Sequence, residues 1–186
     1  MTEQPAAPMT AREGALRSAV LDLERHVASL GWDGPVFVFA LVRTADALAQ
    51  NPGLARELPA EAVRAAEEDA EHLTSIEQDG LPGAGTLEEL LGQLAWPDAV
   101  DGAAIVVERM VVPPEAEQGM PADPQAAVEY LMNHPAREDV RMAAGVLRTG
   151  ESWCALRARS HDSDDAVGGS PEAVPGLVAA LRSTFA

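Results

Sequence analysis

The run AAIVVERMVV (103–112), which Pro113 and Pro114 bring to an end, is the strongest strand pattern in the chain and the feature that most constrains its fold. A second apolar run, PVFVFALV (35–42), is short and rich in β-branched and aromatic residues, as expected of a buried strand. HLTSIEQ (72–78) alternates weakly and predicts an edge strand. The chain therefore builds a sheet that helices have to cover.

Helical patterns precede and follow the predicted strand at residues 35–42. Thr10 and Glu13 have capping-box spacing, and apolar residues then recur at helical intervals until Gly31, namely Leu16, Val20, Leu23, Val27 and Leu30. Residues 44–70 predict one or two short helices, broken at 51–53 and restarted after Pro59.

Three further helices are indicated by their starting residues. Thr86 and Glu89 repeat the capping-box spacing before a helix that we expect to end at Pro97. Asp123 and Pro124 have N-cap and N1 chemistry, and a last apolar helix follows over about 174–185.

A hairpin is expected from residues 140–148 and 151–159, joined by a two-residue turn of Thr149 and Gly150. Strand side chains alternate between the faces of a sheet, so this turn fixes which residues share a face. It places Cys154 with Leu156, Leu147 and Ala143. The opposite face then carries Val146, Met142, Trp153, Arg148, Arg157 and Arg159.

The predicted element order is α-β-α-α-β-α-β-α-β-β-α. It defines an α+β fold with a mainly antiparallel five-stranded sheet packed by helices. At 186 residues the chain fits one domain, which we assign to residues 10–186, after a flexible N-terminal tail at residues 1–9.

The charge and the single cysteine restrict the function. A net charge of −17 repels phosphate backbones, which excludes nucleic acid as a partner. No apolar run approaches the roughly 18 residues that span a bilayer, and the first residues do not resemble a secretory signal. We therefore expect no membrane association and, since Cys154 has no possible internal partner, a reducing cytoplasm.

The chain also resembles a known family over nearly its full length. The resemblance rests on GWDGPVFVFALVRTADAL, HLTSIEQDGLP, WPDAVDGAAIVVER and RSHDSDDAV. These segments resemble a family of acidic actinobacterial proteins named after a propionibacterial member. The family implies no particular activity and no functional residues. The element order is also similar to that of type III secretion chaperones and their relatives, which implies a fold but no function.

The candidate site lies at the end of the hairpin. The window from Arg137 to Arg159 has five arginines and three acids, so it carries +2 inside the acidic chain. Arginines beside an aromatic ring can bind a carboxylate-rich ligand or peptide, or can pair with acids of the same chain. The candidate ligand- or partner-binding residues are Trp153, Arg157, Arg159, Arg148 and His161.

The acidic loop that follows offers a second chemistry. His161, Asp162, Asp164 and Asp165 supply imidazole and carboxylate groups that could bind a divalent cation, although the spacing matches no known metal motif. The alternative is a solvated loop whose aspartates bond to their own backbone.

Other polar residues carry weaker patterns. Asp98 and Asp101 precede the strongest strand, and Glu108 and Arg109 lie along it, which suits either acid–base chemistry or turn formation. His134 can complement a helix end, and His26 and His72 lack supporting neighbours. Cys154 is expected to be a buried, inert thiol. No hydrolase, phosphate-loop or dinucleotide motif is found in the sequence.

The function expected from these patterns is that of a non-enzymatic cytoplasmic binding, adaptor or chaperone-like protein without a cofactor. It would engage a protein partner through a sheet face or the terminal helix, and a homodimer is possible. The alternative is a small metal-dependent hydrolase that uses the loop from His161 to Asp165.

Overall fold

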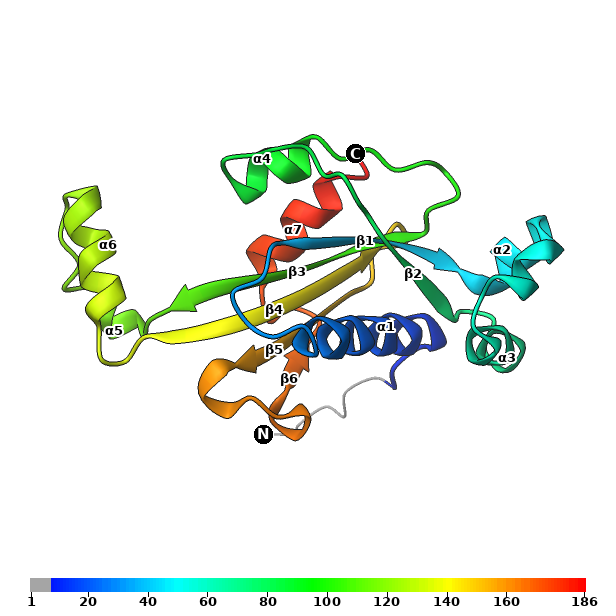
Figure 1. Ribbon diagram of the computed structural model, residues 1–186, viewed down its shortest axis with the longest axis horizontal. Coiled ribbons are helices and arrows are strands. Elements are labelled where there is room, and N and C mark those ends of the chain that lie inside the picture. The colour runs from blue at the N-terminus through cyan, green and yellow to red at the C-terminus, as the bar shows by residue number, and fades with distance from the viewer. Residues whose placement is uncertain (1–7) are drawn as a thin grey trace, which may run out of the picture.

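A six-stranded antiparallel sheet runs through the molecule in the computed structural model, which describes residues 8–186 (Figure 1). The strand order is β2-β1-β3-β4-β5-β6, and every neighbouring pair is antiparallel. The α+β class and the antiparallel sheet are confirmed, whereas the number of five strands is wrong by one. The tail assigned to residues 1–9 lies mostly outside the described residues.

Helix α1 (Ala11–Ala28) covers one face of the sheet. Its predicted capping box is present, since Thr10 Oγ1 accepts from the amide of Glu13 and the Glu13 carboxylate accepts from the amide of Thr10. The helix buries its apolar stripe against β2, β3, β4 and β5, and the buried residues include Leu16, Val20, Leu23 and Val27. One charged residue, Glu24, is buried with them.

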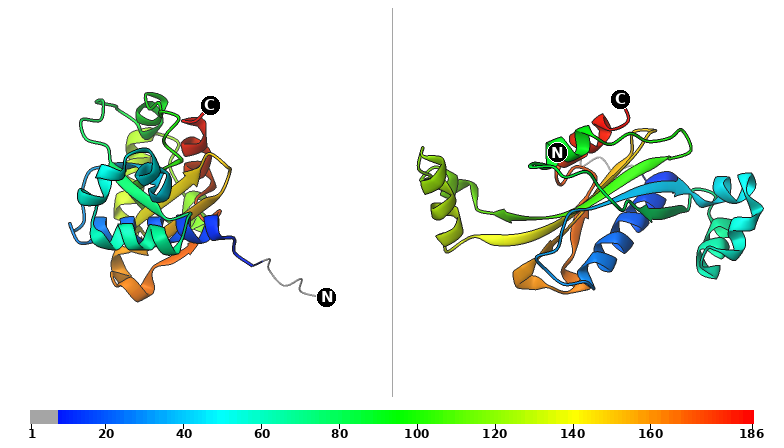
Figure 2. Two further views of the ribbon diagram at one scale, coloured as in Figure 1. Left: turned by 90° about the vertical axis from the view of Figure 1, so that its right-hand side faces the viewer. Right: turned by 45° about the horizontal axis from the view of Figure 1, so that its top comes forward.

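The opposite face is covered by α4 (Leu87–Gly92) and α7 (Pro175–Ser183), which lie side by side in both views (Figures 1 and 2). Leu90, Leu91, Leu177 and Leu181 pack there on the central strands. The α4 helix is shorter than expected, because it ends at Gly92 before Pro97 is reached. Among residues 8–186, no helix combines the length and apolar character that crossing a membrane requires.

Strand β1 (Phe37–Arg43) pairs with both β2 (Leu73–Glu77) and β3 (Gly102–Val111). β2 forms one edge of the sheet, as predicted. The segment between β1 and β2 forms α2 (Thr44–Gln50), the 3₁₀ turn η1 (Pro52–Arg56) and α3 (Ala60–Glu68), which confirms the predicted breaks.

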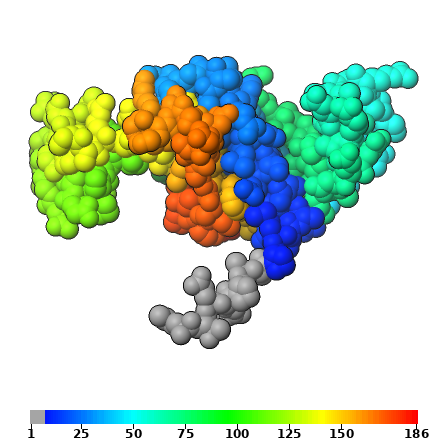
Figure 3. Space-filling view, turned by 90° about the horizontal axis from the view of Figure 1, so that it is seen from below, coloured from blue at the N-terminus to red at the C-terminus, as the bar shows by residue number. Residues whose placement is uncertain are grey.

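Strands β3 and β4 (Glu138–Leu147) are the longest, and they extend beyond the helices that cover the sheet. Residues 110–139, which we call the arm, comprise the far ends of these strands, α5 (Pro114–Glu117) and α6 (Pro124–Asn133). Asp123 caps α6 as predicted. The arm projects from the end of the molecule opposite α2 and α3 (Figures 1 and 3).

The hairpin of β4 and β5 (Ser152–Ala158) has a different register from the one expected of a two-residue turn. The amide of Leu147 donates to the carbonyl of Glu151 at 3.0 Å, so three residues connect the strands, and Gly150 has a φ of +110°. The shift of one residue exchanges the faces of β4 relative to β5.

The predicted face assignment is therefore wrong. Trp153 and Arg157 lie on the α1 side with Ala143 and Leu147, opposite Gly145 and Arg141. Cys154 lies on the α7 side with Ala144, Val146 and Met142.

Beyond β5 the chain forms two 3₁₀ turns, η2 (Arg159–His161) and η3 (Asp164–Ala166), and then the unpredicted strand β6 (Gly168–Ser170). The sequence Gly-Gly-Ser has no β propensity. Gly169 nevertheless suits this position, since a Cβ atom there would lie 2.5 Å from the carbonyl oxygen of Cys154.

Candidate functional site

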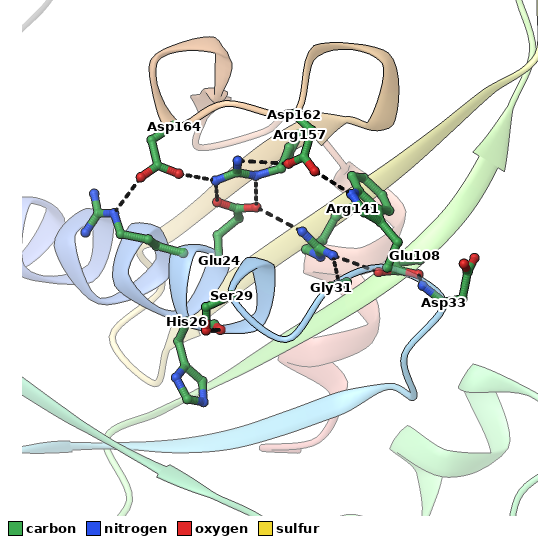
Figure 4. Close-up of polar contacts among 12 residues, drawn as sticks. Glu24, His26, Ser29, Gly31, Asp33, Glu108, Arg141, Arg157, Asp162 and Asp164 are labelled. Carbon is green, nitrogen blue, oxygen red and sulfur yellow. Dashed lines mark hydrogen bonds and ion pairs between the residues drawn. The ribbon is translucent and has the colours of Figure 1, made fainter.

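Arg157, the central residue of the expected site, is buried beneath α1 and forms a bidentate ion pair. Its Nε and Nη2 atoms donate to the two carboxylate oxygens of Glu24 at 2.7 and 2.9 Å (Figure 4). Arg157 is 3% exposed and Glu24 is 1% exposed. Glu24 lies on the buried stripe of α1, and Arg157 faces this helix from β5. The pair therefore joins α1 to the sheet.

The acidic loop completes the coordination of Arg157. Asp162 accepts from Nη1 at 3.1 Å and Asp164 accepts from Nη2 at 2.6 Å. Hydrogen bonds to Glu24 are the main cause that raises the pKa of Arg157 further above its ordinary value. The loop after β5 is thus attached to the same guanidinium as α1 (Figure 4).

Arg141, which the sequence did not single out, extends the cluster across the sheet toward Glu108 of β3. It is fully buried, donates to Glu108 at 2.9 Å and to the carbonyl of Gly31 at 2.5 Å, and lies 3.8 Å from Glu24. Its guanidinium also stacks on the ring of Trp32, 4.2 Å from the ring centre. The sequence contains a signal for this cluster, since Glu24 is an acid within the apolar stripe of a helix and Arg141 is an arginine within a strand.

Arg159 lies at the outer edge of this cluster. It forms a bidentate pair with Asp33 at 2.9 and 3.0 Å, while its side chain remains 41% exposed. This hydrogen bonding is the main cause that lowers the pKa of Asp33. The Trp32 indole donates to Asp162 at 2.8 Å, which is the first cause of the lowered pKa of Asp162.

Trp153 and Arg148 do not join Arg157 in one exposed surface. Trp153 is half-buried under Arg17, and its indole nitrogen is buried without a hydrogen-bond partner in residues 8–186. Arg148 follows β4 at the other end of the strands, where it donates to the carbonyls of Val100, Trp96 and Pro97. Trp153 and Arg157 do share the α1 side of β5, but Arg148 lies apart from both, so the expected face that joins all three is wrong.

The four candidate metal ligands do not converge on one point, and each has a contact within the chain. Asp162 and Asp164 accept from Arg157, His161 Nδ1 lies 2.9 Å from Ser160 Oγ, and the pKa of Asp165 is lowered first by Ser163. Within residues 8–186, no three histidine, cysteine, aspartate or glutamate side chains are grouped as a metal ion requires.

The weaker candidates of the sequence have structural contacts. Asp101 accepts from the amide of Arg43 at 2.7 Å, and Glu108 accepts from the amide of Asp33 at 2.7 Å. Cys154 is buried, and burial raises the pKa of its thiol, as expected of an inert cysteine. Asp98 and His26 are exposed.

Two of the histidines also have structural contacts. His72 Nδ1 lies 2.8 Å from Thr44 Oγ1, and His134 Nδ1 accepts from the amide of Ala136 at 3.1 Å. His134 also packs edge-on against Tyr130. Each ring therefore serves the geometry of its own turn or strand end.

The arm carries the surface that sequence reasoning missed. Four of the seven large hydrophobic residues that are exposed in residues 8–186 belong to it: Met110, Met120, Val128 and Met132. Val128 and Met132 are 55% and 54% exposed and lie one turn apart on α6, a helix without any buried residue. Tyr130 Oη donates to the carbonyl of Ala116, which holds α6 on α5.

The fold and its contacts define an acidic α+β protein with an internal ion cluster and an exposed apolar arm. Residues 16–186 match the family model described as PPA1309-like protein, and the chain belongs to this family. The match confirms the resemblance to a family named after a propionibacterial member. Comparison with curated proteins and with solved structures finds no match. The similarity to type III secretion chaperones stays a prediction.

Proposed function

We propose that the protein is a non-enzymatic cytoplasmic binding or adaptor protein that engages a protein partner through the arm. The observation that carries this proposal is the concentration of exposed methionine and valine side chains on residues 110–139. Large exposed apolar residues that gather in one region are typical of interaction surfaces, and methionine adapts to partners of different shape. The single, buried cysteine supports the cytoplasmic location.

The charge of the arm defines the chemistry of the partner. Residues 110–139 contain six acids and one arginine, which gives a local charge of −5. Glu115, Glu117 and Glu129 are exposed and make no ion pair within residues 8–186. A basic amphipathic segment of another protein fits this surface better than a second copy of the chain, whose arm repeats the negative charge.

The metal-dependent hydrolase has less support. The carboxylates of Asp162 and Asp164 already accept hydrogen bonds from the buried Arg157, so a cation at the loop would compete with a guanidinium. Trp153 and Arg159 are secondary candidates for recognition, because both are reached by solvent. They carry less weight than the arm, since each already packs against or pairs with residues of this chain.

The test is capture from the native cytoplasm with the double variant Val128→Gln and Met132→Gln. Glutamine keeps the helix propensity while it removes the apolar surface. Because α6 has no buried residue, the variant should keep its melting temperature and lose the captured protein. The matched control is Ile76→Gln, which removes an exposed apolar side chain on β2. Equal capture by all three proteins would contradict the proposal.

A further inference from the structure

An apolar cavity of about 190 Å³ lies between α4, α7 and the sheet, on the face opposite the ion cluster. Aliphatic and methionine side chains form most of its wall, and they come from α4, the two central strands, and α7 with its N-cap residue: Leu87, Leu91, Val107, Met142, Val174 and Leu177. No aromatic or amide side chain lines it. A ligand portion that enters the cavity must therefore carry no polar atom that needs a partner.

Two charged side chains, Arg109 and Glu88, border this cavity. Arg109 follows Val107 by two residues on β3, so both side chains lie on the same face of the sheet. The guanidinium is exposed, and its protein contact is a 3.2 Å hydrogen bond to the neighbouring carbonyl of Glu108. Within residues 8–186 no acid pairs with it, although the chain carries 30 acids and 13 arginines.

A second, more open hollow of about 570 Å³ adjoins the cavity. Both hollows are lined by Leu87, Glu88 and Arg109, so these two charged side chains lie where the hollows meet. The outer hollow is bounded by the loop before α4, which includes Leu81, Pro82 and Gly85. A ligand can therefore place an apolar tail in the inner cavity and its polar head beside Arg109.

We propose that the cavity and the adjoining hollow together bind a monocarboxylate with an unbranched aliphatic chain. The inner cavity of about 190 Å³ has the volume of about six water molecules at roughly 30 Å³ each, and a methylene group is of similar size. A chain of about six to eight carbons fills it. The carboxylate then accepts the two-pronged hydrogen bonding of the Arg109 guanidinium.

Glu88 makes the preference for an anionic head group testable, because its carboxylate repels the anionic head that Arg109 attracts. Removing the Glu88 charge should strengthen binding of a carboxylate, whereas a cationic head would depend on Glu88. This proposal concerns the α4 and α7 face and is independent of partner binding by the arm.

The experiment is calorimetric titration of the full chain with octanoate, octan-1-ol and octylammonium at low salt. Octanoate should bind, Arg109→Gln should weaken it by at least about tenfold, and Glu88→Gln should tighten it. Arg64→Gln, which changes an exposed arginine on α3, should leave the affinity unchanged. Ala180→Trp should abolish binding by filling the cavity, with melting curves to verify that each variant is folded.

Several outcomes would overturn the proposal. The first is octanoate binding that neither Arg109→Gln nor Ala180→Trp weakens. The second is octylammonium binding that Glu88→Gln removes, which would assign a cationic ligand instead. The absence of any heat with octanoate up to millimolar concentration would equally overturn it.

Discussion

Arg157 of β5 and Glu24 of α1 face each other as two planar groups joined by hydrogen bonds of 2.7 and 2.9 Å, with both side chains almost fully removed from water. A buried charge without its partner is strongly unfavourable, whereas the complete pair is tolerated. The same guanidinium also binds Asp162 and Asp164. The packing of α1 on the sheet and the position of the loop after β5 therefore depend on one another.

Replacing Glu24 by glutamine should lower the free energy of unfolding by about 3–5 kcal/mol, because the charge of Arg157 stays buried without its main partner. Urea denaturation monitored by circular dichroism measures this loss. The control is Asp22→Asn, which removes an exposed pair with Arg25 and should cost less than about 1 kcal/mol. Equal unfolding midpoints for the two variants would contradict the role of the buried pair.

Acid should weaken the attachment of the loop. The pKa values of Asp162 and Asp33 are lowered below the ordinary value of 3.8, first by the hydrogen bonds from Trp32 and Arg159, respectively. A depressed pKa in the folded state contributes stability above the unfolded pKa, and this contribution disappears as pH falls through the folded value. Stability should therefore decline below about pH 4.

The variant Asp162→Asn provides the check on this pH dependence. It should be less stable than the wild type at neutral pH and should lose less stability on acidification, since one titrating carboxylate is gone. Urea midpoints between about pH 7 and pH 3 compare the two proteins. Parallel curves over the whole range would show that Asp162 does not contribute to the acid sensitivity.

The turn between β4 and β5 should require glycine at position 150. Gly150 has a φ of +110°, which side chains with a Cβ atom rarely adopt, so Gly150→Ala should destabilise the protein by about 1 kcal/mol or more. Gly83→Ala is the matched control, because an added Cβ meets nothing within 4 Å at either position and only Gly150 of the two has a positive φ. A shift of the melting temperature in the control alone would contradict this reading.

This turn also marks the limit of what the sequence could predict. Alternation within each strand was predictable, and β1, β2 and β3 appear where their patterns indicated. The three-residue connection between β4 and β5 could not be predicted, because Thr149 and Gly150 fit a turn of two residues as well as one of three. The observed register differs from the predicted one by one residue. Cys154 therefore lies on the α7 side and not with Ala143 and Leu147 on the α1 side, and Trp153 lies on the face opposite to Met142 and Val146.

The ion cluster could be predicted only in part. The surplus of arginine near β4 and β5 indicated a special region, and an internal pairing was one of its two interpretations. Its main acid, Glu24, lies 133 residues away from Arg157 in the sequence, and nothing local connects them. The exposure of the apolar residues of α6 could not be predicted either, because Val128 and Met132 have the spacing of a buried helix stripe.

Helix α1 should be structural rather than a binding element. Leu23 is 6% exposed within the core on the α1 side, so Leu23→Ala should lower the free energy of unfolding by about 2–5 kcal/mol. Chemical denaturation measures the change, and partner capture by the fraction that remains folded should be unchanged. Wild-type stability combined with lost capture would instead place the interface on α1.

Photo-cross-linking in living cells from single surface positions tests directly whether the arm contacts a protein partner. A photoreactive residue at Met132, on the arm, is compared with one at Ile76, on the β2 edge, since both side chains are exposed and apolar. We expect a cross-link from position 132 to a second, basic protein and none from position 76. The absence of a cross-link at position 132, the same products from both positions, or a cross-link only to another copy of the chain would contradict it.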